Sequence, residues 1–234
     1  MQIKALAGVA VAALSLTAAQ TASASIFVLN FAGLNGNAEE PVENFYNGGF
    51  GGDGSGPGPN YGITFTSNGL ACSGQPGGTC NSAEIPGGPG ANLLFFLGGT
   101  DATMNVAAGF TTGFSFFYSA VNNPGFINVW SGLDETGTLL ATLALPTTPN
   151  DGDPGCFGTN FCPYVPINVA FAGTAESVGF GGTINQIAFA DVTLGSNTPG
   201  APEPATWAMM LLGVAGVGAT LRGARRKVSA ATAA

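Results

Sequence analysis

The chain has 234 residues, of which 8% are charged, and its formal net charge is −8 with no histidine. All five basic residues lie near the two termini, so residues 25–201 contain twelve acidic residues and no lysine, arginine or histidine. For that region this composition excludes a Ser-His-Asp or Cys-His nucleophile, a histidine-ligated zinc and a nucleic-acid partner, whose phosphates need cations.

The first 24 residues have the pattern of a secretory signal peptide. Lys4 precedes an uncharged stretch from Ala5 to Ala19, and Ala22 and Ala24 provide the small residues that signal peptidase requires. The apolar stretch is short for a permanent membrane span, which makes an uncleaved anchor the weaker alternative. We therefore expect cleavage after Ala24, so that the exported protein starts at Ser25.

Residues 25–200 are typical of a single β-sandwich. Alternating or apolar runs recur about every ten to fifteen residues between Gly, Pro, Asn and Asp clusters, without a long amphipathic helix. Phe114, Phe116 and Tyr118 alternate along one run, and every second residue from Leu139 to Leu145 is apolar, as expected for side chains between two sheets. The expected strands are Ile26–Phe31, Tyr61–Ser67, Asn92–Leu97, Thr103–Ala107, Gly113–Ser119, Phe126–Ser131, Leu139–Leu145, Val165–Phe171, Ser177–Phe180 and Gln186–Leu194.

A glycine-rich segment runs from Gly51 to Pro59, before the second expected strand. It lacks the Gly-Lys-Ser/Thr sequence of a phosphate-binding loop, and no strand-to-helix pattern surrounds it. We interpret this segment as a flexible connection.

Four cysteines form two closely spaced pairs in glycine-rich loops. An even number of cysteines in an exported chain predicts disulfides, and the spacing favours Cys72–Cys80 and Cys156–Cys162. A zinc site built from all four thiolates is disfavoured, because neither pair has the two to four intervening residues that such sites usually show.

Carboxylates are the only charged side chains in this region. Calcium takes oxygen ligands, and Asp151 and Asp153 have the spacing of two ligands of one ion. Asp191 in the last expected strand is a third candidate, although Ala190 beside it offers no second side-chain ligand. Structural calcium is thus an alternative to a chain without any cofactor.

The C-terminus has three ordered parts. Pro202, Glu203 and Pro204 precede an uncharged segment from Ala205 to Leu221, and a basic cluster follows. As a helix, residues 205–221 would be roughly 25 Å long, near the lower limit for a membrane span. Trp207 suits an interfacial aromatic, and the basic cluster predicts a cytoplasmic end. The clustered basic residues are Arg222, Arg225, Arg226 and Lys227.

This tail resembles the PEP-CTERM protein-sorting domain over residues 201–228, including the Trp-Ala-Met-Met variant of the motif. The resemblance implies a Gram-negative exporter in which exosortase, a membrane transpeptidase, recognises and removes the tail. It also implies an association with exopolysaccharide and biofilm production. Tails of this kind are also named after ice-binding proteins, but ice binding by the domain is not expected, because the Thr64-Phe65-Thr66 pattern stands alone instead of forming a flat threonine array.

The region before the tail resembles a recurring ectodomain of PEP-CTERM proteins. The resemblance implies a lectin-type jelly roll, and it spans most of residues 25–200. The segments that carry it are Phe45–Gly49, Asn60–Ile63, Gly113–Tyr118, Val129–Ala141 and Asn185–Leu194.

Three functions compete. The tail and the lack of catalytic side chains favour an exported protein, held at the inner membrane and then sorted to the cell surface or matrix, with a non-catalytic structural or adhesive role. The alternative is a carbohydrate-binding module in which Trp130, Tyr46 or Tyr61 stacks on a sugar, although Trp130 lies in an alternating run typical of a core residue. An acid-pair glycoside hydrolase is a remote third function, and nothing selects its two carboxylates. The expected partners are signal peptidase, exosortase, the inner membrane and polysaccharide.

Overall fold

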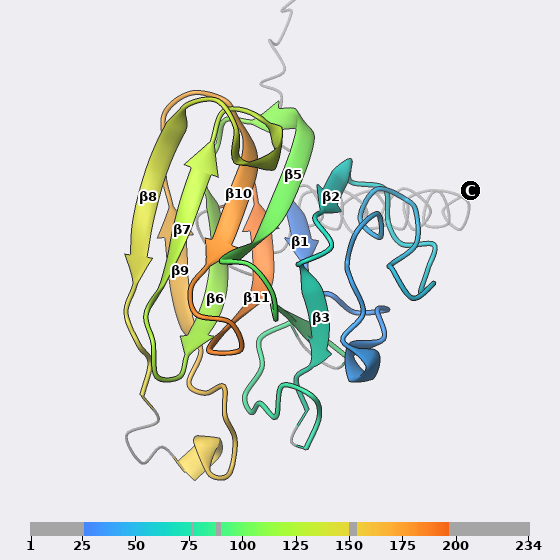
Figure 1. Ribbon diagram of the computed structural model, residues 1–234, viewed down its shortest axis with the longest axis vertical. Coiled ribbons are helices and arrows are strands. Elements are labelled where there is room, and N and C mark those ends of the chain that lie inside the picture. Colours follow the sequence, from blue (N-terminus) through green and yellow to red (C-terminus); the bar gives the residue numbers. More distant parts are fainter. Residues whose placement is uncertain (1–25, 76, 88–89, 150–153, 197–234) are drawn as a thin grey trace, which may run out of the picture.

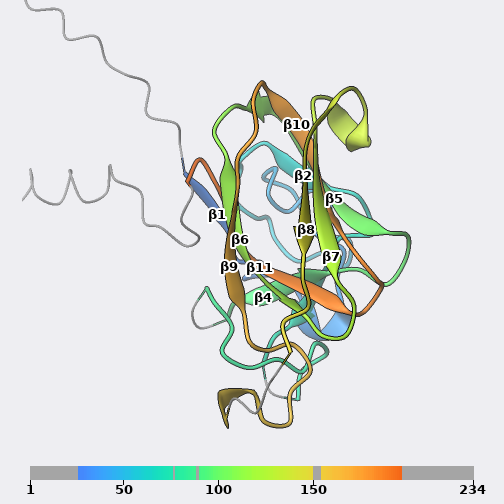
Figure 2. The same ribbon diagram turned by 90° about the vertical axis from the view of Figure 1, so that its left-hand side faces the viewer.

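Two antiparallel sheets form the protein. The structure is a computed structural model, and it describes residues 26–75, 77–87, 90–149 and 154–196. One sheet has the order β3-β4-β11-β6-β9 with β1 paired to β11, and the other has the order β2-β5-β10-β7-β8 (Figure 1). The two sheets lie face to face as separate layers (Figure 2), which confirms the predicted all-β sandwich. The elements are β1 (Phe27–Leu29), η1 (Gly36–Ala38), β2 (Ile63–Phe65), β3 (Leu70–Ser73), β4 (Asn92–Phe95), β5 (Asp101–Phe110), β6 (Phe114–Ala120), β7 (Gly125–Trp130), η2 (Leu133–Glu135), β8 (Leu139–Leu145), η3 (Pro154–Cys156), β9 (Val165–Val169), β10 (Ala175–Gly181) and β11 (Ile187–Leu194).

Interlocking phenylalanine rings join the two sheets. Phe114 and Phe116 extend from β6 and Phe189 extends from β11, and all three contact Phe180 of β10 in the opposite sheet. The ring centroids of these contacts are 5.1 to 6.1 Å apart, and the rings meet edge to face. All four side chains are fully buried. The inward alternation predicted for β6 is therefore confirmed, since Tyr118 is buried as well.

Each of the ten predicted runs overlaps a strand, but β3 was not predicted. Its four residues do not alternate in burial, since Ala71 and Cys72 are both fully buried. The strand forms because Leu70 to Ser73 pair with β4.

The inward alternation predicted for β8 is wrong at Leu139. Ala141 pairs with Val129 and Leu139 pairs with Trp130, which leaves Leu140 as an extra residue in a bulge. Because of the bulge, the side chain of Leu139 points to the outer face of the sheet instead of the core, and it is 45% exposed.

Both predicted disulfides, Cys72–Cys80 and Cys156–Cys162, are present. The first disulfide packs with Leu93, Phe95 and Phe161 in a second apolar cluster, separate from the main core between the sheets. Because this cluster also contains side chains of β11, that strand is buried on both faces over its full length.

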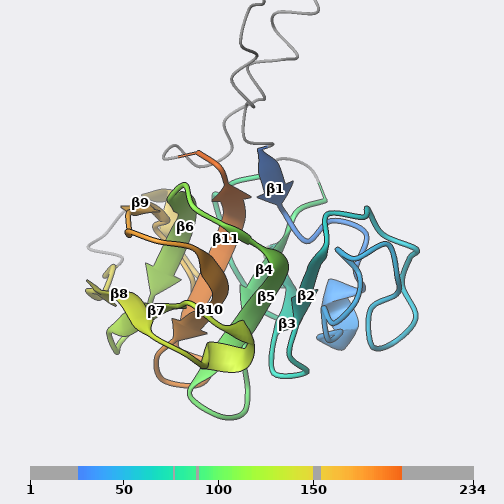
Figure 3. The ribbon, with the colours of Figure 1, turned by 90° about the horizontal axis from the view of Figure 1, so that it is seen from above.

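The glycine-rich segment, predicted as a flexible connection, folds around the buried carboxylate of Glu40. That carboxylate accepts hydrogen bonds from the backbone N–H groups of Asp53 (3.1 Å), Ser55 (2.9 Å) and Asn35 (2.7 Å). An added Cβ at Gly51 would lie 2.5 Å from Oε1 of Glu40, so this position requires glycine. The chain between β1 and β2 lies beside the sandwich and not between its sheets (Figures 1 and 3).

Several predicted features lie outside the described residues. They are the signal peptide with Ala22, Ala24 and Ser25, the acidic residues Asp151 and Asp153, and the tail with its helix at 205–221. Within the described ranges, no helix is long and apolar enough to cross a membrane.

Candidate functional site

The five-stranded sheet carries a pair of acidic side chains that the sequence did not select. Asp101 of β5 and Glu135 of η2 lie 3.2 and 3.0 Å, respectively, from the hydroxyl group of Thr103. The carboxylate of Glu135 lies directly over Gly179 of β10, where an added Cβ would clash with it. Glycine at this position therefore allows the carboxylate to rest on the sheet.

Hydrogen bonds to its backbone hold η2 over the sheet. The N–H of Glu135 donates to the hydroxyl of Ser177 (2.9 Å), and the N–H of Asp134 donates to the side chain of Asn105 (2.8 Å). The amide of Asn105 in turn donates to the Asp134 carboxylate at 2.6 Å. Asp134 and Glu135 have φ angles of 51° and 59°, a left-handed conformation that is uncommon outside glycine. These contacts therefore compensate for an unfavourable backbone conformation.

The pKa of Glu135 is raised above its usual range. Burial is the largest cause, and the negative charge of Asp101 and a hydrogen bond to it also favour the protonated form. Glycosidases need a sugar between their two carboxyl groups, which are about 5–5.5 Å apart in retaining enzymes and about 6.5–9.5 Å apart in inverting ones. Here the hydroxyl of Thr103 contacts both carboxyl groups, so a protein side chain occupies the space beside the pair.

Two of the three aromatic residues considered as sugar platforms differ from expectation. Tyr46 is 2% exposed, and its hydroxyl accepts a hydrogen bond from the N–H of Phe31 at 2.7 Å, so the platform hypothesis is wrong for this residue. Trp130 is not a core residue, because the alternation of β7 buries Val129 and leaves Trp130 on the outer face, half-buried beside Glu135.

The third aromatic residue, Tyr61, lines an apolar cavity at the end of the sandwich where β11 ends. Its ring stacks on Phe27 with a centroid distance of 4.8 Å and on Tyr46 at 5.9 Å. The cavity has a volume of about 330 Å³, and Phe110 and Leu194 also line it. The ring of Tyr61 already stacks on Phe27 and Tyr46, so a sugar that stacked on Tyr61 would have to replace one of these two contacts.

Asp191 lies in a bulge of β11, where the pairing with β6 shifts between Ala190 and Thr193. Its φ angle is 50°, and it is 6% exposed. Its Oδ1 atom has no hydrogen-bond partner among the described residues, and burial raises its pKa. An unpartnered buried carboxylate oxygen fits a cation ligand, but calcium takes about six to eight oxygens. The calcium hypothesis therefore stays a prediction, since Asp151 and Asp153 lie outside the described residues.

Within the described ranges, one group of three side chains has the proximity of metal ligands, namely Glu84, Cys156 and Cys162. The two sulfur atoms are joined in a disulfide, whereas a metal requires thiolates. This group is therefore a disulfide beside a carboxylate.

The fold defines the described domain as a jelly-roll-like β-sandwich. Residues 201–227 match the PEP-CTERM protein-sorting motif, so the chain carries this sorting signal and the predicted resemblance of its tail is confirmed. No curated protein matches the chain.

Several solved structures are similar to this chain over about half of its length. One is a glycoside hydrolase family 43 arabinoxylan arabinofuranohydrolase from Bacillus subtilis, with 23% identity, a TM-score of 0.32 and coverage of 47% of this chain and 22% of that chain. The similar part therefore spans about a fifth of that enzyme. A family 6 carbohydrate-binding module has 20% identity, a TM-score of 0.29 and coverages of 47% and 78%. The module CBM6cm-2 from Cellvibrio mixtus lichenase 5A has 10% identity, a TM-score of 0.27 and coverages of 47% and 80%.

Proposed function

We propose that this chain is exported, held at the inner membrane by residues 205–221 and then cut by exosortase near Pro202-Glu203-Pro204. The β-sandwich would then serve at the cell surface or in the matrix as a non-catalytic structural or adhesive module, linked to exopolysaccharide or biofilm. The PEP-CTERM match at residues 201–227 carries this proposal. Two prolines disfavour a regular helix at the junction, which would leave an extended substrate for the protease outside the bilayer.

The non-catalytic role is supported by the chemistry of the domain. Residues 25–201 have no histidine, lysine or arginine to activate a nucleophile. The carboxyl groups of Asp101 and Glu135 both contact the hydroxyl of Thr103, which lies beside them where a substrate group would have to enter. Polysaccharide turnover that disappears in both Asp101→Asn and Glu135→Gln would contradict this part of the proposal.

The sorting step is tested by replacing Pro202, Glu203 and Pro204 with alanine in the native host. We expect export to continue while full-length protein accumulates in the membrane fraction, as measured by fractionation and intact mass. Replacing the basic residues 225–227 instead should weaken retention before cleavage, because these residues anchor the cytoplasmic end. An alanine variant that still reached the surface, shortened to the wild-type mass, would refute the sorting proposal.

A further inference from the structure

A polar cavity of about 250 Å³ lies at the end of the sandwich where β6 ends and β11 begins, the lower end in Figure 1. We name it the amide cavity, because four of its lining residues carry side-chain amides. No carboxylate is among the described residues that line it, although acidic residues are the only charged residues of this domain. The lining residues are Thr79, Val121, Asn122, Asn160, Phe161, Asn185 and Gln186.

Two of the four amides are free to bind a ligand. Asn122 donates to the side-chain oxygen of Gln186 at 3.1 Å, and the amide nitrogen of Gln186 donates to the carbonyl of Asn185 at 3.0 Å. The side chains of Asn160 and Asn185 form no hydrogen bond with any described residue. Each offers two N–H donors and one carbonyl acceptor. The cavity thus presents unused donors and acceptors of neutral charge.

The two disulfide loops form part of the cavity wall. The loop closed by Cys72–Cys80 contributes Thr79, and the loop closed by Cys156–Cys162 contributes Asn160 and Phe161. Each disulfide restricts the conformations of a loop of fewer than ten residues, so the wall needs little ordering when a ligand binds.

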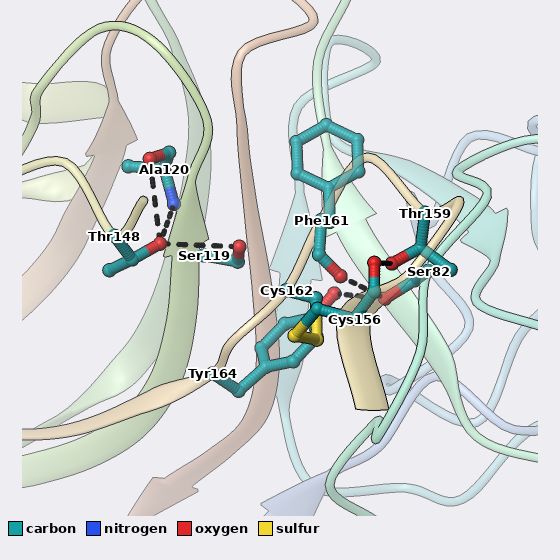
Figure 4. Close-up of a disulfide and its surroundings, with 9 residues drawn as sticks. All are labelled: Ser82, Ser119, Ala120, Thr148, Cys156, Thr159, Phe161, Cys162 and Tyr164. Atoms are coloured by element: carbon teal, nitrogen blue, oxygen red, sulfur yellow. Dashed lines mark hydrogen bonds between the residues drawn. A yellow bond between two sulfur atoms is a disulfide. The ribbon is translucent and has the colours of Figure 1, made fainter. Parts of the chain in front are cut away.

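Hydrogen bonds connect the second loop to the segment that follows the first. The N–H of Asn160 donates to the carbonyl of Asn81 at 2.8 Å. The hydroxyl of Ser82 lies 2.7 Å from the carbonyl oxygen of Phe161 and 2.8 Å from the hydroxyl of Tyr164 (Figure 4). The part of the wall formed by the two disulfide loops is therefore held in place before any ligand arrives.

We propose that the amide cavity binds a single neutral sugar residue, such as one residue of a polysaccharide chain. Anions are repelled by the negative domain, and a cation would find no carboxylate among the described lining residues. Sugar hydroxyls both donate and accept hydrogen bonds, which matches the free amides of Asn160 and Asn185. The volume is below the roughly 300–1,000 Å³ of pockets for drug-sized ligands, which favours one small polar group.

The location of the amide cavity is compatible with the sorted surface role. Gln186 at the cavity directly precedes β11, whereas Gly195 follows it, and eight strand residues span roughly 25 Å. The cavity therefore lies at the opposite end of β11 from the point where the described chain leads toward the sorting motif. The inference adds a ligand to the proposed role and does not require the sorting step.

The test measures sugar binding by saturation-transfer NMR on the full chain, in a zwitterionic detergent without a sugar headgroup. The probes are glucose, galactose, mannose and N-acetylglucosamine. We expect at least one of them to bind with a Kd of about 1 mM, because a ligand with few atoms makes few contacts. The double variant Asn160→Ala/Asn185→Gly should bind at least about tenfold more weakly, because the hydrogen bonds that both amides make to the sugar are lost.

The two substitutions are chosen to preserve the fold. Asn185 has a φ angle of 55°, which glycine adopts without strain, and the hydrogen bond of Asn160 to Asn81 uses its backbone. Asn168→Ala, an exposed change on β9, is the matched control and should leave binding unchanged. An unchanged melting temperature in the double variant separates loss of the ligand from loss of the fold.

Three outcomes would overturn the inference. They are no binding of any of the four sugars at about 50 mM, equal binding by wild type and the double variant, and binding of trialanine in place of the sugars. The last outcome would assign the cavity to peptides. None of them affects the sorting proposal, whose test measures the location and mass of the chain.

Discussion

Glu40 keeps its negative charge inside the protein because backbone N–H groups replace the water that burial removes. Burial by itself would raise the pKa of Glu40, but hydrogen bonds from Ser55, Asn35 and Asp53 outweigh it and hold the pKa below its usual value of 4.5. The same bonds shape the glycine-rich segment, so the charge and the loop depend on each other.

Glu40→Gln should therefore lower the free energy of unfolding by about 1–3 kcal/mol, because hydrogen bonds to a charged acceptor are lost. Since the folded-state pKa is lowered, the contribution of Glu40 is present above the unfolded-state pKa and disappears as the pH falls through the folded-state value. Urea unfolding between pH 2 and 7 measures this difference. Glu176→Gln is the control, and an equal loss in both variants would contradict this role.

Asp191 shows the opposite situation, because burial raises its pKa and Oδ1 has no partner among the described residues. Ionised Asp191 thus destabilises the fold, and stability should decline as the pH rises through its raised folded-state pKa. Without calcium, Asp191→Asn should raise the melting temperature at pH 7 by about 2–4 °C. Asparagine also suits the positive φ of this bulge. Asp53→Asn, at an exposed position, should change little, and a lower melting temperature of Asp191→Asn would contradict the argument.

The calcium hypothesis is tested with the same pair of proteins. A bound ion at free concentration c stabilises the folded state by RT ln(1 + c/Kd), so the effect grows with the logarithm of the ion concentration once it exceeds Kd. If Asp191 is a ligand, millimolar calcium raises the melting temperature of wild type and leaves that of Asp191→Asn unchanged. Equal melting temperatures of wild type with calcium and with a chelator would reject the hypothesis.

At the scale of elements, β6, β10 and β11 are held together by a small number of aromatic side chains. Phe116 of β6 contacts both Phe180 and Phe189, so its removal would leave a cavity shared by the two sheets. The bulge at Leu140 and the disulfide loops act at the same scale, since they decide which side chains of β8 and β11 are covered.

Phe116→Ala should cost about 3–5 kcal/mol of stability, the usual range for a buried phenylalanine. Phe157→Ala is a matched control, because Phe157 is 90% exposed in the second disulfide loop and its loss should change stability by less than about 0.5 kcal/mol. Urea denaturation measures both variants. Similar losses of stability would show that the ring cluster does not join the sheets.

For the whole molecule, the main electrostatic feature is a domain whose charges all have the same sign. Residues 25–201 contain twelve acidic residues and no basic residue, so no attraction offsets their mutual repulsion. Exposed charges are screened over about 10 Å at 0.1 M salt and over about 3 Å at 1 M. Ionic strength should therefore affect stability in one direction.

We expect the melting temperature to rise by about 2–4 °C between 20 mM and 1 M sodium chloride at constant pH, which corresponds to roughly 1 kcal/mol for a chain of this size. Calorimetry measures the shift. A melting temperature that fell with salt would indicate attractive charge contacts that the sequence of the domain does not provide.

The sequence by itself determined the positions of ten strands, the two disulfide pairs and the sorting motif. Each of these depends on local information: a two-residue alternation, a short spacing between cysteines, and an ordered motif of proline, apolar and basic residues. Long-range contacts enter none of these patterns. That is why the short strand β3, which exists through its pairing with β4, was missed.

Only the tertiary structure decided which side chains meet. Asp101 and Glu135 are far apart in the chain and come together because η2 folds over β5 and β10, held by Ser177 and Asn105. The amide cavity likewise combines four loops that follow or precede different strands. Alternation specifies which residues of a strand share a face. The register, the bulge at Leu140 and the loops that cover each face depend instead on contacts between distant segments. No local sequence pattern encodes the energies of those contacts.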